Sequence, residues 1–168
     1  MPPPTPPPQR RAFTVAEANA LLPVLEETFT RIDLRRAELD EASRGLQILD
    51  LLWGDGVRAP TNPDHQEFLK HQEVIQRVLG EIEELVRSEV LVHGIRFPVG
   101  GLEHGILDFP TTWKGRWVFL CWKRGEPRVS VWHEIHAGFA GRRTLTPEQE
   151  EGMGLEDPAG MDDSRLDV

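Results

Sequence analysis

The residues best able to do chemistry gather in one stretch, CWKRGEPRVSVWHEIHAGFAGR, at residues 121–142. This stretch contains the only cysteine of the chain, two histidines and two glutamates. A thiol beside an imidazole can form a nucleophile–base pair, and thiol, imidazole and carboxylate groups are all metal ligands. Either chemistry requires the side chains to converge on one point, so the local structure decides between them.

The relation between Cys121 and His133 depends on the expected β-hairpin that KRGEP closes. A two-residue turn places the two side chains on opposite faces, because side chains alternate along a strand. A loop one residue longer places them on one face but pairs His133 with Trp117, about 13 Å from Cys121 at ~3.3 Å per residue. Metal ligands must lie within about 2.0–2.3 Å of one ion. We therefore predict that Cys121 is a small buried hydrophobe.

The sequence HEIH, at residues 133–136, invites comparison with the helical zinc-protease motif. Its histidines are three rather than four residues apart, and they lie on a predicted strand. We expect His133 to be a hydrogen-bonded polar group of the core, because it ends an apolar face. Glu134 and His136 share the other face, either as a hydrogen-bonded pair or as weak candidates for metal ligands.

Two further charged positions stand out beside the hairpin. Asp108 interrupts the apolar strand GILDFP, and a buried carboxylate must find partners. The arginines of GFAGRR could bind an anion, although we expect Arg142 to pair with a carboxylate: Asp108, Glu126 or Glu134. The candidate ligand-binding residues are thus Asp108, Glu126, His133, Glu134 and Arg142. Structural roles are assigned to Cys121, Trp122 and Trp132.

Two helices and a small sheet must position these residues. Helical periodicity covers about 14–52 and 64–92, whereas the region of about 95–136 has the glycines, aromatics and β-branched residues of short strands separated by turns. The predicted fold is α+β, with a long N-terminal antiparallel helical hairpin and a small C-terminal antiparallel β-sheet. The heptad-like spacing of the helices also allows a coiled coil.

Local signals predict where the helices begin and where the first is disturbed. Thr14 with Glu17, and Asp64 with Glu67, have the spacing of capping boxes. Pro23 lies in the first helical pattern, so we expect a kink or the end of a short first helix at this point.

Both ends of the chain differ in composition from residues 12–146, which are expected to form a single domain. Residues 1–11 are a proline-rich lead, and residues 147–168 are a tail that holds eight of the 28 acidic side chains and one basic side chain. We expect both ends to be disordered and dispensable for folding, because they contain few apolar side chains.

Charge and hydropathy argue against several classes of partner. The acidic tail carries most of the net charge of −9, and the nearly neutral remainder has no basic stripe, so we expect no binding to nucleic acid. The longest apolar run, WVFLCW, is far shorter than the roughly 20 residues of a membrane span. We also expect no secretory signal, and the single cysteine fits a reducing cytoplasm.

The order of motifs resembles the bacterial family known as domain of unknown function 2203. The resemblance rests on FTVAEANALLP, GILDFP, LCW, GE, WHE and GFAGR, and covers about residues 12–146. It implies a cytoplasmic bacterial protein with a helical segment, a small β-region and no assigned activity. The positions matching the family's polar signature are Asp108, Cys121, Glu126, His133, Glu134 and Arg142, and the resemblance gives none of them a role.

The function predicted from these observations is non-enzymatic assembly. A first helix spanning on the order of 55 Å is too long for the small sheet to cover, and uncovered apolar surface normally marks an interface. We therefore expect a homo-oligomer formed through the helices, without a cofactor. The alternative is that the polar cluster of the β-region binds a small anion or a divalent metal, or that it catalyses a reaction.

Overall fold

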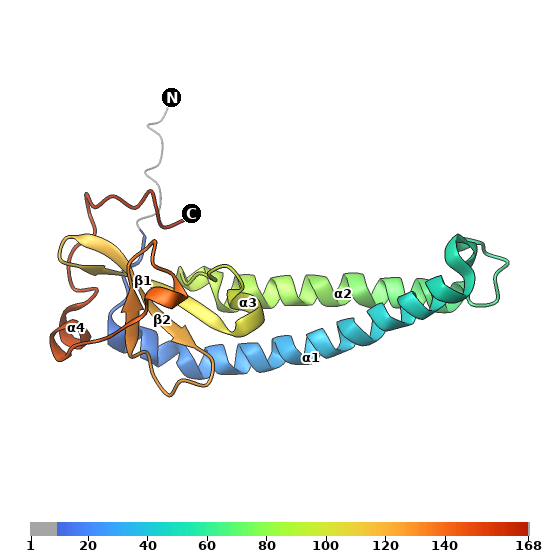
Figure 1. The fold of residues 1–168 in the computed structure, drawn as a ribbon, viewed down its shortest axis with the longest axis horizontal. Coiled ribbons are helices and arrows are strands. Elements are labelled where there is room, and N and C mark those ends of the chain that lie inside the picture. The colour runs from blue at the N-terminus through green and yellow to red at the C-terminus, as the bar shows by residue number, and fades with distance from the viewer. Residues whose placement is uncertain (1–9, 168) are drawn as a thin grey trace, which may run out of the picture. The chain divides into compact units, whose positions relative to one another are not determined.

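The computed structural model describes residues 10–167 and has the α+β fold expected from the sequence (Figure 1). The chain forms two compact units. Of the described residues, the sheet unit comprises residues 10–26 and 90–167, and the helical unit comprises Glu27–Glu89. The chain leaves the sheet unit within its first helix and returns to it after its second, and the single domain expected for residues 12–146 stays a prediction. Within the described residues, no helix is both long and apolar enough to cross a membrane.

The first helix, α1 (Val15–Trp53), begins at the predicted capping box. The backbone N–H of Thr14 donates to Glu17 Oε1 (3.2 Å), and the N–H of Glu17 donates to Thr14 Oγ1 (3.1 Å). Of the two outcomes expected at Pro23, the end of a short first helix is wrong, because the chain stays helical on both sides of it, whereas the kink stays a prediction. Pro23 is exposed, so water can bond the backbone carbonyl that proline, lacking an N–H, leaves unpaired.

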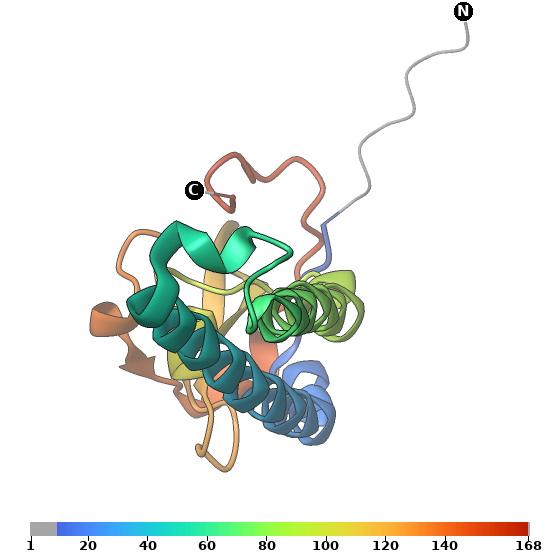
Figure 2. The same cartoon turned by 90° about the vertical axis from the view of Figure 1, so that its right-hand side faces the viewer.

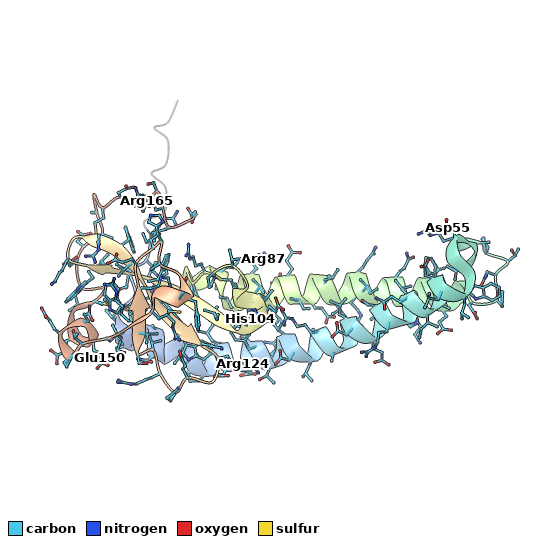
Figure 3. The ribbon with its side chains drawn as sticks, in the orientation of Figure 1. Asp55, Arg87, His104, Arg124, Glu150 and Arg165 are labelled. Carbon is cyan, nitrogen blue, oxygen red and sulfur yellow. The ribbon has the colours of Figure 1, made fainter. Side chains whose placement is uncertain are left out.

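The helical unit consists of the later part of α1, the 3-10 helix η1 (Gly54–Arg58) and α2 (His65–Glu89). Asp55, labelled in Figure 3, lies in η1. The carboxylate of Asp64, which the sequence predicts to cap α2, accepts a hydrogen bond from Trp53 Nε1 (2.7 Å). This bond ties the end of α1 to the start of α2.

Ion pairs between α1 and α2 define how the two helices of this unit run. Arg35 pairs with Glu81, and Glu38 pairs with Arg77. The partner number falls as the α1 number rises, so α2 lies antiparallel to this part of α1, and the two run side by side in Figure 2.

The sheet unit contains one four-stranded antiparallel sheet in which the strands follow their chain order. The strands are β1 (Ile106–Trp113), β2 (Arg116–Lys123), β3 (Val131–His133) and β4 (Arg143–Thr144). The turn between β1 and β2 consists of Lys114 and Gly115, whose φ angles of 50° and 75° are typical of a type I′ turn. Short helices lie in the connections: η2 (Leu91–His93), α3 (Gly101–His104) and η3 (Phe139–Gly141).

The strand register gives the sheet two different faces. Leu107, Phe109, Leu120 and Trp122 are all fully buried and belong to one face. The opposite face carries the candidate site, together with aromatic side chains. Because β1 and β2 are buried along nearly all of their length, they form the core of the sheet unit.

Segments distant in sequence bond to the side of β1 that faces away from β2. The backbone N–H groups of Phe13 and Gly154 donate to β1 carbonyls at 2.8 and 3.0 Å. Arg96 exchanges two backbone hydrogen bonds with Asp108, each of 3.0 Å. A Cβ atom at Gly154 would lie 2.2 Å from the carbonyl oxygen of Phe13, so this contact requires glycine.

The segment after residue 146 differs from the disordered tail that the sequence predicts. α4 (Pro147–Gly152) begins with a capping box formed by Thr146 and Gln149. Met153 is fully buried and Leu166 is 2% exposed, and Leu166 belongs to a core cluster with Trp117 and Phe119. Composition misleads here because two buried side chains are separated by many exposed acidic ones. Residues 1–9 of the proline-rich lead lie outside the described residues.

Candidate functional site

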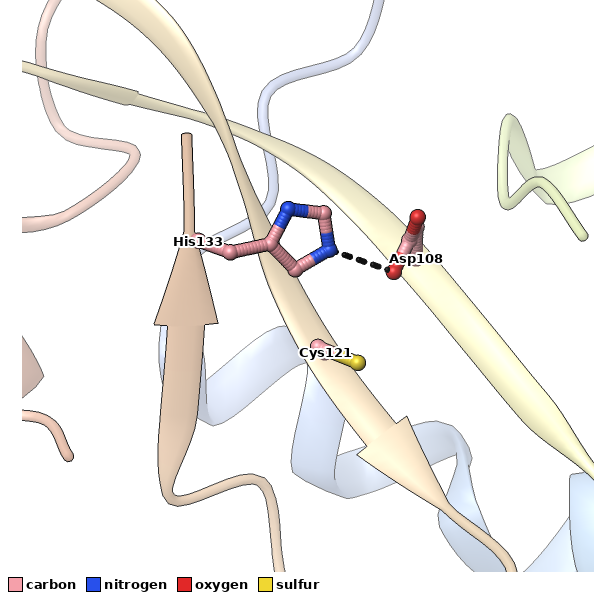
Figure 4. Close-up of side chains that lie close together, drawn as sticks. All are labelled: Asp108, Cys121 and His133. Carbon is pink, nitrogen blue, oxygen red and sulfur yellow. Dashed lines mark hydrogen bonds and ion pairs between the residues drawn. The ribbon is translucent and has the colours of Figure 1, made fainter. Parts of the chain in front are cut away.

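Three adjacent strands bring Asp108, Cys121 and His133 together on one face of the sheet (Figure 4). Asp108 in β1 lies directly opposite Cys121 in β2. His133 in β3 lies opposite Phe119, two residues from Cys121 and therefore diagonal to it. One ligand atom from each of the three residues lies within 4.8 Å of the other two, and no side chain of the three is more than 1% exposed.

This geometry corrects the sequence analysis of Cys121 and His133. The loop between β2 and β3 spans residues 124–130, so the register is shifted from both registers considered. In the observed register His133 pairs with Phe119 instead of Trp117. The side chains of Cys121 and His133 therefore lie on one face of the sheet, at diagonal positions. The prediction that they lie on opposite faces, or about 13 Å apart, is therefore wrong.

Both ring nitrogens of His133 face hydrogen-bond acceptors. Nε2 lies 3.0 Å from Asp108 Oδ1, and Nδ1 lies 2.8 Å from the backbone carbonyl of Glu134. Burial lowers the pKa of His133, but the hydrogen bond to Asp108, its charge and the Glu134 carbonyl outweigh burial and raise that pKa. The arrangement thus favours an imidazolium that donates to both acceptors.

Arg96 supports the cluster from the neighbouring segment. Its Nη2 lies 3.4 Å from Asp108 Oδ2, its Nη1 donates to the backbone carbonyl of Leu166 (2.8 Å), and its guanidinium lies 3.9 Å from the ring centroid of Phe119. Arg96 also lines a surface cavity of about 590 Å³. Arg96 is not among the site residues predicted from the sequence, although its place between Ile95 and Phe97 in IRFPVGG fits a strand.

The thiol of Cys121 is poorly suited to nucleophilic catalysis. Burial, followed by the charge of Asp108, raises its pKa to about 12. A thiol that is almost wholly protonated at neutral pH and inaccessible to solvent lacks the thiolate that attacks a substrate. The cluster can therefore hold a proton or a cation, and its cysteine is not an activated nucleophile.

Alkylation tests the state of this thiol. At about pH 8, Cys121 in the native protein should react with iodoacetamide on the order of 40-fold more slowly than in the unfolded chain, since the lower thiolate fraction outweighs the gain in nucleophilicity. Burial slows the reaction further. Mass spectrometry of timed samples, with and without guanidinium chloride, gives the two rates, and equal rates would contradict the assignment.

The remaining predicted site residues lie in other pairings. Glu134 pairs with Arg116, which is the first cause of the lowered pKa of Glu134. His136 Nε2 lies 3.1 Å from a guanidinium nitrogen of Arg165. The suggested Glu134–His136 pair is thus replaced by two separate contacts with arginines.

Arg142 pairs with Glu126, one of the three carboxylates predicted as its partner. Its Nη2 donates to both carboxylate oxygens of Glu126, at 2.7 and 2.6 Å. Glu126 also accepts from the backbone N–H of Lys123 (2.8 Å), and its carbonyl accepts from Trp122 Nε1 (3.0 Å). These bonds hold the loop after β2, so Arg142 and Glu126 shape the register that brings the cluster together.

A second candidate surface lies within the helical unit, between α1 and α2. It is a groove of about 250 Å³ with basic residues on α1, acidic residues on α2 and a leucine on each helix. The lining residues are Arg31, Leu34, Arg35, Glu81, Glu84 and Leu85. Leu34 is 64% exposed, so most of this apolar side chain is open to solvent at the groove.

The fold and the two candidate surfaces define an α+β protein with a long helical unit and a small sheet that contains a buried Asp–Cys–His cluster. Residues 11–145 match the family model described as uncharacterized conserved protein (DUF2203), and the chain belongs to this family. The resemblance inferred from the order of motifs is therefore confirmed. No curated protein and no solved structure matched the chain.

Proposed function

We propose that this protein is a non-enzymatic assembly protein that binds a second copy of itself through the groove of its helical unit. The observation that carries the proposal is the self-complementary lining of that groove. A symmetric dimer uses the same patch on both partners, so the patch must match itself after a two-fold rotation. Arg35 and Glu81 already pair across the groove within one chain. A two-fold rotation can set Arg31 of each copy against Glu84 of the other, with the leucines between them, which meets this requirement.

The apolar surface continues along α1 beyond the groove. Ile48 is 57% exposed and Leu52 is 66% exposed. They follow Leu34 by fourteen and eighteen residues, spacings that return to nearly the same face of an α-helix. Large apolar side chains repeated on one exposed face favour a helix–helix contact, including one of coiled-coil type.

Light scattering with size-exclusion chromatography tests this proposal at tens of micromolar protein. The wild type should elute as a dimer. Leu34→Glu should weaken association by about 10- to 100-fold, because it places a charge in the apolar centre of the contact. Leu155→Glu is the matched control, since Leu155 is 69% exposed and belongs to the sheet unit.

Charge reversal gives a more specific test of the same contact. Glu84→Arg and Arg31→Glu should each weaken the dimer, and the double variant should restore it, because opposite charges again face each other across the two-fold axis. A monomeric wild type, or a double variant that is weaker than both single variants, contradicts the proposal.

Two features outside the groove also agree with this proposal: the charge of the chain and its single cysteine. The near-neutral body of the chain favours a protein partner over nucleic acid, and a single free, buried cysteine favours a reducing compartment such as the cytoplasm. The alternative function, in which the polar cluster of the sheet binds an anion or a metal or catalyses a reaction, depends on other residues and can be tested separately.

A further inference from the structure

We propose that Asp108, Cys121 and His133 form a binding site for one zinc ion. Their ligand atoms already lie within 4.8 Å of one another. Two donors of a tetrahedral zinc site are separated by about 3.4 Å when each lies about 2.1 Å from the ion. The three donors, on adjacent strands (Figure 4), therefore need to approach one another by no more than about 1.4 Å to reach this spacing.

The histidine is oriented as a zinc ligand requires. Its Nδ1 faces the carbonyl of Glu134 at 2.8 Å, an acceptor that holds a proton on this nitrogen. Nε2 faces the cluster, and it presents a lone pair there once its own proton leaves. Metal-binding histidines commonly donate their second N–H to a backbone carbonyl or carboxylate, which fixes the ring and its tautomer.

The two carboxylate oxygens of Asp108 have different neighbours. Oδ1 faces the cluster, whereas Oδ2 lies 3.4 Å from Arg96 Nη2. An arginine on the second oxygen orients the carboxylate and leaves the first oxygen for the ion. Because Arg96 is held in turn by the carbonyl of Leu166, this support reaches the C-terminal segment.

The donor set selects the kind of metal. One thiolate, one imidazole and one carboxylate suit Zn²⁺, whereas Mg²⁺ and Ca²⁺ prefer oxygen ligands alone. A thiolate and a carboxylate also neutralise the two charges of the ion, which matters at a site with no exposed ligand. Three protein donors leave the fourth tetrahedral position for water or a small ligand.

Zinc binding exchanges protons for the metal. The ion takes the place of the proton on Cys121 Sγ and of the proton between His133 Nε2 and Asp108, and both protons leave to solvent. No electron is transferred. The proposal is independent of self-association, since it concerns only residues of the sheet unit.

The experiment uses the full chain after treatment with a chelator and buffer exchange. Competition with a colorimetric zinc chelator should show one zinc ion per chain. Cobalt in place of zinc should give a thiolate-to-cobalt charge-transfer band, which reports a bond to Cys121. Cys121→Ala should abolish the band and weaken zinc binding at least about 100-fold. Circular dichroism verifies that this variant is folded.

Two further arms make the result specific. His136→Ala and Glu134→Gln, which change the other metal candidates of this region, should bind zinc as the wild type does. Zinc should also protect Cys121 of the wild type from alkylation in guanidinium-free buffer, a readout that needs no variant. Absence of zinc binding by the wild type, or equally tight binding by Cys121→Ala, overturns the proposal.

Discussion

Replacing Asp108 with alanine is expected to lower the free energy of unfolding of the metal-free protein by about 3–5 kcal/mol, the usual effect of removing one partner of a buried ion pair. The substitution leaves Nε2 of His133, which is 1% exposed, without its acceptor and also removes the carboxylate beside Arg96. Urea denaturation followed by circular dichroism measures the loss.

Two variants control this result. Asp108→Asn keeps one acceptor oxygen but no charge, so its effect should be intermediate. Glu134→Ala removes a partner from an ion pair near the surface and should change stability by less than about 1 kcal/mol. If Asp108→Ala is no more damaging than Glu134→Ala, the Asp108–His133 pair does not stabilise the fold.

The stability difference between wild type and Asp108→Ala should also depend on pH. The pKa of His133 is raised in the folded protein, so its contribution is fully present below the unfolded value of about 6.5 and is lost as the pH rises through the folded value. Denaturation at about pH 6 should therefore show a larger difference than denaturation at about pH 9.

A chain that ends at Thr146 is expected to lose about 3–6 kcal/mol of stability, because it no longer buries Met153 and Leu166, each worth about 1.5–3 kcal/mol. Trp117 and Phe119, which pack with Leu166, become exposed to water. The same deletion removes the hydrogen bond from Arg96 to the carbonyl of Leu166. Thermal melting of the shortened and complete chains measures the difference.

Point substitutions show whether the loss comes from these two side chains. Met153→Ala and Leu166→Ala should each destabilise by about 2–5 kcal/mol, whereas Leu155→Ser, at a position 69% exposed, should have little effect. A shortened chain that melts within a few degrees of the complete one would instead agree with the sequence analysis, which expects a dispensable tail.

The sequence predicts best those features that depend on neighbouring residues. The capping box of Thr14 and Glu17 forms as expected, because both partners lie within one turn of helix. The strands of the sheet are also recognisable, since they contain runs of apolar residues between glycines. Pro23 is a local signal that does not end the helix, because its exposed position lets the helix continue through it.

Features that depend on distant contacts could not be predicted in the same way. The position of His133 opposite β2 depends on the conformation of the loop between β2 and β3. The ion pair of Arg142 and Glu126 helps to hold that loop, and neither residue lies within β2 or β3. The burial of Leu166 depends on aromatic side chains almost fifty residues earlier in the chain. Arg96 reaches Asp108 because an isolated antiparallel bridge pairs Arg96, which lies outside the four strands, with Asp108 of β1.

The hydrogen bonds along the outer side of β1 have a consequence for how copies of this chain can meet. An edge strand with unpaired amide and carbonyl groups is a template for a strand from another molecule, and so for aggregation. On β1, Phe13, Arg96 and Gly154 already occupy backbone groups along that edge. The opposite edge, β4, is only two residues long and includes Arg143. The sheet is therefore protected at both edges against growth by strand addition.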